Sequence, residues 1–117
     1  GLGGRVAAGL VADRLQADGL FLLGFPLHPQ DKPEKSDPEV LFRTTAPTLF
    51  VQGTRDRRCD PTALRQALRR VGAPIELHDV VDADASFKVP RKSGRTRDEI
   101  HAEVFGVLSS WIARRLD

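Results

Sequence analysis

The stretch TLFVQGTRDRRCDP, residues 48–61, contains an apolar run, a polar turn and the start of a helix. The run Thr48–Gly53 is short, apolar and closed by a glycine, which is typical of a strand buried in a parallel sheet. Pro61 suits the first turn of a helix, and Asp60 before it suits the cap. The stretch therefore predicts a strand followed by a helix.

Two further strands are expected on either side of this unit. Leu20–Leu23 is an apolar run between glycines, which fits a strand buried on both faces. Residues 74–81 form the third candidate, with a rough alternation that suits the edge of a sheet. Residues 26–40 hold four prolines and many charges, so we expect a long loop without any regular element there.

Helices are expected over residues 3–15, from Pro61 to about Val71, and from a capping box at residues 96–99 to the C-terminus. The last helix has one apolar stripe, made of Ile100, Val104, Val107, Leu108, Trp111, Ile112 and Leu116. Helices alternating with strands predict an α/β fold of three layers, in which about three parallel strands are flanked by helices.

Composition narrows the class of protein. The chain has 117 residues, 40% of them hydrophobic and 29% charged, which is typical of one globular domain. Its net charge of +2 argues against a dedicated nucleic-acid binder. There is no apolar run of the ~18 residues that a membrane span needs and no signal peptide, so we expect a cytoplasmic protein. Cys59 is the single cysteine, which excludes an internal disulfide and a zinc site of several thiolates.

A parallel sheet of only three strands would leave one long edge bare, which is an aggregation hazard. We therefore expect residues 1–117 to be a single partial domain whose first strands lie upstream of Gly1. A homodimer through the open sheet edge is the other way to cover it.

Four segments together resemble the C-terminal half of α/β-hydrolases. They are GLGGRVAA (1–8), DGLFLLGFPLHP (18–29), APTLFVQGTRD (46–56) and, after Asp84, SFKVPRKSGRT (86–96). The chain looks most like the dienelactone-hydrolase-like subgroup, which includes the hydrolase-like domain of a nonspecific-lethal chromatin complex subunit and its small bacterial relatives. The resemblance implies an ancestry in ester or dienelactone-type hydrolysis, a small ester-like substrate, and no metal or organic cofactor.

The resemblance also assigns the catalytic positions. The family's nucleophilic serine falls on Gly1, and the backbone N–H of Leu2 is the candidate for the oxyanion hole. The triad acid falls on Asp56, and the histidine base falls on Ala85. Serine hydrolysis needs a hydroxyl, a base and an orienting acid, so two of the three roles are empty. We expect an inactive hydrolase; the alternatives are a non-catalytic binding or scaffold module and the remnant of a decayed gene.

Asp56 has a plainer interpretation as an Asx-type turn at the end of a strand. His28 is expected in a loop, His78 in the middle of a strand, and His101 on the polar face of the last helix. Ser86 and Ser93 are expected to be loop residues and not migrated nucleophiles.

Cys59 follows Arg57 and Arg58, but no histidine is adjacent to it in sequence, so we expect a loop thiol without function; the alternative is a nucleophile whose pKa the two arginines lower. The basic cluster before the last helix is either an anion site or a solvated surface. Its members are Lys88, Arg91, Lys92, Arg95 and Arg97. The second basic group, Arg65, Arg69 and Arg70, is expected on the solvated face of a helix.

Overall fold

The computed structural model describes residues 19–116, with side chains from Gly19 to Arg115. The helix expected over residues 3–15, the nucleophile position Gly1 and the oxyanion candidate Leu2 lie outside the described residues, as does the side chain of Leu116.

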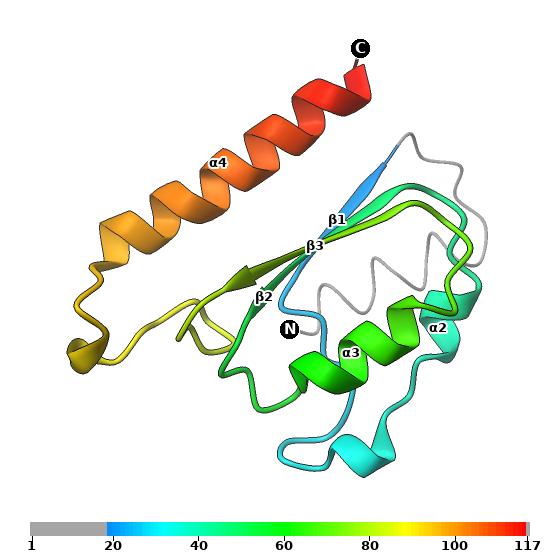
Figure 1. Cartoon of the computed structure of the whole chain (residues 1–117), viewed down its shortest axis with the longest axis horizontal. Helices are drawn as coiled ribbons and strands as arrows, with labels where there is room; N and C mark the ends of the chain where they lie inside the picture. The colour runs from blue at the N-terminus through cyan, green and yellow to red at the C-terminus, as the bar shows by residue number, and fades with distance from the viewer. Residues whose placement is uncertain (1–18, 117) are drawn as a thin grey trace.

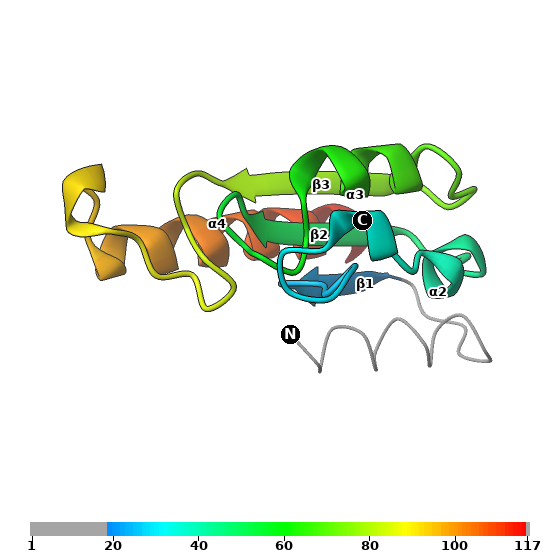
Figure 2. The same cartoon turned by 90° about the horizontal axis from the view of Figure 1, so that it is seen from below.

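Three parallel strands form one sheet in the order β1-β2-β3, and all three are confirmed from the sequence prediction (Figures 1 and 2). They are β1 (Leu20–Leu23), β2 (Thr48–Gly53) and β3 (Ile75–Val80). The last is one residue shorter at each end than expected. Because the strands are parallel, the loops that follow them meet at one edge of the sheet, which is where α/β proteins bind ligands.

Helices cover both faces of the sheet, so the described residues form the predicted three-layer α/β arrangement (Figure 1). One face carries α2 (Glu39–Phe42) and α3 (Pro61–Leu68), and the other carries the long α4 (Arg97–Leu116). The predicted caps form. The Asp60 carboxylate accepts a bond from the Ala63 N–H (2.9 Å), and Thr96 and Glu99 bond each other's backbone N–H groups (3.1 and 3.2 Å).

Two boundaries predicted from the sequence are wrong. The segment 26–40 is not a plain loop, because it contains the 3-10 turn η1 (Pro33–Lys35) and the start of α2. Two of its prolines, Pro33 and Pro38, occupy the first turn of η1 and the N-cap of α2, where a missing N–H costs nothing. Helix α3 ends at Leu68 and not near Val71, since the chain tightens there into bonds between residues three apart.

Two apolar cores lie on the two faces. Between the sheet and α3, the rings of Phe25 and Phe50 meet edge to face with centroids 6.0 Å apart, beside Leu22 and Leu64. Between the sheet and α4, the core is formed by Leu49, Val51, Val80, Ala83, Ile100 and Trp111.

The α4 side of β1 is less covered than the sequence predicts. Phe21 and Leu23 are 44% and 37% exposed, so β1 is buried on one face only. Ile112, placed by the sequence in the inward stripe of α4, is 40% exposed. The cause is the position of α4, whose main contacts are with β3, at the far side of the sheet from β1.

Candidate functional site

The acid position, Asp56, lies in the turn that follows β2. Its side chain is buried, and its Oδ1 accepts a hydrogen bond from the Arg58 N–H (2.8 Å). The Asx-type turn considered from the sequence is therefore present, and it fixes the carboxylate at the carboxyl edge of the sheet.

The base position, Ala85, lies in a tight loop after β3. Asp84 closes this loop, because its Oδ1 accepts bonds from the N–H groups of Ser86 (2.8 Å) and Lys88 (3.0 Å). Its own N–H donates to the Lys88 carbonyl (2.9 Å), and Phe87 adopts a left-handed φ of 60°. The loop thus presents Ala85 at the surface.

The turn after β2 and the loop after β3 are held together by their backbones. The Arg55 N–H donates to the Ala83 carbonyl (2.8 Å), and the Asp82 N–H donates to the Thr54 hydroxyl (2.8 Å). A Cβ on Gly53 would lie only 2.3 Å from the Ala83 oxygen, so this approach requires glycine.

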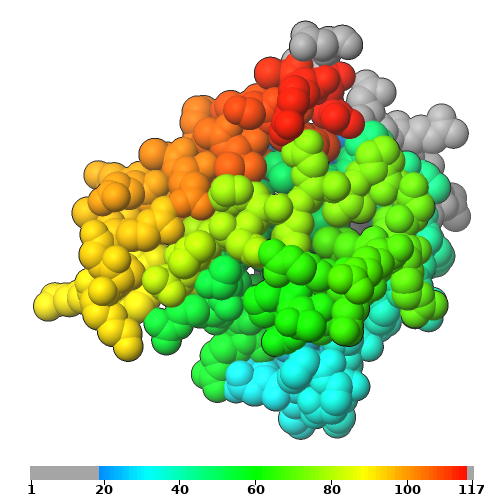
Figure 3. Space-filling model, in the orientation of Figure 1, coloured from blue at the N-terminus to red at the C-terminus, as the bar shows by residue number. Residues whose placement is uncertain are grey.

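One hollow of about 380 Å³ brings the acid and base positions together. Its other lining residues are Gln30, Arg55, Arg57, Arg58, Asp84 and Ser86. We call it the edge hollow. The space-filling view shows the loop after β3 (yellow) at the left corner of the molecule (Figure 3). Lys88 and Pro90 of that loop line a second hollow together with Arg55 and Arg57. Among the described residues, the lining of the edge hollow contains the carboxylates of Asp56 and Asp84 and the hydroxyl of Ser86 but no imidazole.

His28 does not supply the missing base. It is buried, its Nε2 accepts a bond from the Asp60 N–H (2.8 Å), and its Nδ1 lies 2.7 Å from the Pro29 carbonyl. These partners require a neutral ring with the proton on Nδ1. Both nitrogens are therefore bonded, Nε2 to the cap of α3 and Nδ1 within the loop after β1.

Cys59 lacks the lowered pKa that the alternative of an activated nucleophile requires. The thiol is buried in the core on the α3 side, and burial, together with the charge of Asp56, raises its pKa to about 12. The arginines that follow Asp56 in sequence point to solvent and do not compensate for the burial.

Residues 1–113 match the family model of the alpha/beta hydrolase domain. The chain belongs to the α/β-hydrolase family. The three parallel strands with helices on both faces agree with part of that fold. No solved structure gives a significant match to the chain.

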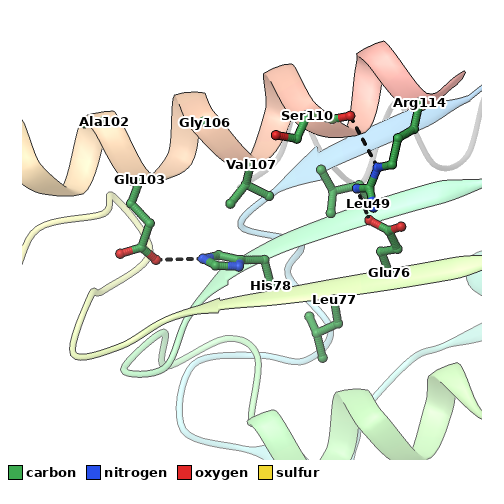
Figure 4. Close-up of a pocket in the computed structure, with 10 residues that line it drawn as sticks. All are labelled: Leu49, Glu76, Leu77, His78, Ala102, Glu103, Gly106, Val107, Ser110 and Arg114. Atoms are coloured by element: carbon green, nitrogen blue, oxygen red, sulfur yellow. Dashed lines mark hydrogen bonds and ion pairs between the residues drawn. The ribbon is translucent and has the colours of Figure 1, made fainter. Parts of the chain in front are cut away.

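In this chain of the α/β-hydrolase family a larger hollow, of about 630 Å³, lies between α4 and β3, and neither Asp56 nor Ala85 lines it. Figure 4 shows Leu49 of β2 and Val107 of α4 between the helix and the sheet, whereas the side chain of Leu77 points to the other side of the sheet, where it packs against the core on the α3 side. The charged groups of the hollow are already paired, Glu76 with Arg114 (2.8 Å) and His78 Nε2 with Glu103 (2.7 Å). We regard this hollow as a gap between helix and sheet edge, since its polar groups bind each other.

Glu103 of the hydrolase chain is a residue that sequence reasoning missed. It also pairs with Arg95, whose guanidinium donates to the Val81 carbonyl (3.2 Å), so three segments of chain meet at one carboxylate. Burial opposes its ionisation, but its bonds to His78 and Arg95 outweigh burial and lower the pKa of the carboxyl. The pairs span 8 and 25 residues, so no local pattern reveals them.

The remaining sequence candidates are dispersed over the hydrolase surface. His101 is exposed on α4, and Ser93 lies at the end of the 3-10 turn η2 (Arg91–Ser93), where its Oγ accepts from the Arg95 N–H (3.2 Å). Arg65 is exposed as expected but pairs with Asp79 of β3. Within residues 19–115, no three His, Cys, Asp or Glu side chains are grouped to hold a metal ion. In the same part of the chain, no helix is long and apolar enough to cross a membrane.

Proposed function

We propose that this α/β-hydrolase chain does not hydrolyse esters and acts as a binding module at the edge hollow. The observation that carries the proposal is the pairing of Asp56 with Ala85 in one hollow. The acid position still holds an aspartate, Asp56, whereas the side chain at the base position, Ala85, is a methyl group.

The other nucleophiles and bases support the same conclusion. Position Gly1, which the resemblance aligns with the serine, has no side chain. Cys59 is buried, and both nitrogens of His28 are bonded. Ser86 lines the edge hollow, but a serine hydroxyl without an adjacent base is a weak nucleophile.

We further propose that the chain derives from the dienelactone-hydrolase-like subgroup and that its ligand is a small ester-like molecule. The support is the set of segments FPLHP, VQGTRD and SFKVPRKSGRT taken together. Of these, the second ends at Asp56 and the third begins directly after Ala85, so both border the edge hollow.

Hydrolysis of p-nitrophenyl acetate tests the loss of activity. We expect the purified chain to match buffer alone, and Asp56→Asn to match the wild type. Asp98→Asn, an exposed carboxylate in the first turn of α4, is the control variant. A working triad would give protein-dependent hydrolysis that falls about 10⁴-fold when the acid loses its charge. Such a fall in Asp56→Asn but not in Asp98→Asn would overturn the proposal.

A further inference from the structure

Two of the three arginines that line the edge hollow have no acidic partner among the described residues. The side chains of Arg55 and Arg58 are exposed, and neither makes an ion pair within residues 19–115. The third arginine, Arg57, is held by Asp31. Lys88 adds a further positive charge in the adjoining hollow, next to Arg55.

The carboxylates of the same hollow are already engaged. Asp84 Oδ1 accepts two backbone N–H groups, and Asp56 Oδ1 accepts one. Both groups thus have part of their negative charge compensated by the protein. The two unpaired guanidiniums are the groups left to attract a ligand, with the Ser86 hydroxyl and the Gln30 amide as neutral donors beside them.

The backbone around this edge is held in uncommon conformations. Asp31, Asp82 and Phe87 have φ values of 60°, 67° and 60°, and each follows the carboxyl end of a strand. Among the described residues they are the non-glycine positions with positive φ. Such positions concentrate at ligand sites, and the carboxyl edge is where parallel sheets bind ligands.

We propose that the edge hollow binds an oxyanion, a carboxylate or phosphate group of a small molecule, between the guanidiniums of Arg55 and Arg58. The planar guanidinium fork matches both groups through paired N–H···O bonds. Ala85 leaves free the space that a larger side chain would occupy. This inference adds an anionic group to the small ester-like ligand of the binding module proposed above and rests on that function.

Titration of the ¹⁵N-labelled chain with inorganic phosphate, and separately with acetate, tests the inference by amide chemical shifts. We expect saturable shifts at residues 55–58 and 84–88 with at least one of the two anions. The double variant Arg55→Gln/Arg58→Gln should weaken that binding about tenfold or more, since it removes charge-assisted hydrogen bonds. Arg55→Lys keeps the positive charge but lacks the guanidinium fork, so its affinity for the anion should lie between those of the wild type and the double variant.

Arg69→Gln is the control for charge, because it removes one positive charge, half of what the double variant removes, at an exposed residue at the opposite end of α3 from the edge hollow. Saturation by phosphate alone or acetate alone supports the inference and identifies the group. Shifts that do not saturate would indicate diffuse attraction and would overturn the inference. Binding that is weakened as much in Arg69→Gln as in the double variant would overturn it in the same way. Ester hydrolysis dependent on Asp56 would instead refute the proposed function, so the two failures are distinct.

Discussion

The thiol of Cys59 is packed among apolar side chains, including Leu27 and Leu64, and is 1% exposed. Because the thiolate is the reactive form and burial raises the thiol pKa to about 12, we expect almost no reaction with a thiol reagent at pH 8. In denaturant one thiol per chain should react at the rate of a free cysteine. Rapid modification of the native chain, followed by absorbance, would contradict this.

Gly53 permits the closest backbone approach at the edge of the sheet. In Gly53→Ala the new Cβ would meet the Ala83 and Asp84 carbonyl oxygens at 2.3 and 2.5 Å, and backbone cannot move aside as a side chain can. We expect a loss of about 2 kcal/mol or more in the free energy of unfolding, measured with urea. Gly72→Ala, with no atom within 4 Å of its Cβ, is the control and should change it little.

Glu103 connects helix α4 to the rest of the molecule, because it pairs with Arg95 of the preceding loop and with His78 of β3. Its carboxyl pKa is lower in the folded chain than the ordinary 4.5. A carboxyl group whose pKa is lower in the folded state stabilises the fold at pH values above its unfolded-state pKa. This stabilisation is lost as the pH falls through the folded-state pKa.

We therefore expect the unfolding free energy to fall as pH drops from about 5 to 3, and to fall less steeply in Glu103→Gln. Urea unfolding at several pH values measures this slope. Glu34→Gln, an exposed carboxylate with no ion pair in the described residues, is the control. Identical slopes for the wild type and Glu103→Gln would refute the role of Glu103.

The elements that the sequence predicted well are those with local signals. The strands followed from short apolar runs between glycines and prolines, and the caps from residues three positions apart. For the site, the resemblance gave Asp56 and Ala85, and the structure shows them in one hollow. The burial of Cys59 and the meeting of three segments at Glu103 depend on packing between distant residues, which no local pattern encodes.

At the scale of the whole molecule, large apolar side chains are exposed together on one side. Phe21 and Leu23 of β1 face the α4 side, in register with Leu49 and Val51. Phe105 and Ile112 lie seven residues apart on the side of α4 opposite the hollow between α4 and β3. β1 itself carries no charge that would deter pairing with another strand.

We expect this surface to drive self-association through the edge of β1, which light scattering on a sizing column would detect. Phe105→Glu should shift the chain toward monomer, because it places a charge within the apolar contact. Val81→Glu is the matched control, since Val81 is 56% exposed but lies after β3 at the other side of the sheet. A monomeric wild type, or an equal effect of Val81→Glu, would contradict the expectation.

The side chain of Gln52 in β2 forms a hydrogen bond to the chain just after the end of β1. Its buried Oε1 accepts a bond from the Phe25 N–H at 2.6 Å, one residue past the point where Gly24 bonds to β2. An amide in a loop normally exchanges its hydrogen with solvent during small local openings. Because Phe25 is buried in the core on the α3 side, we expect its amide to exchange only when that core opens around Gln52, so that its exchange rate reports the opening of this core.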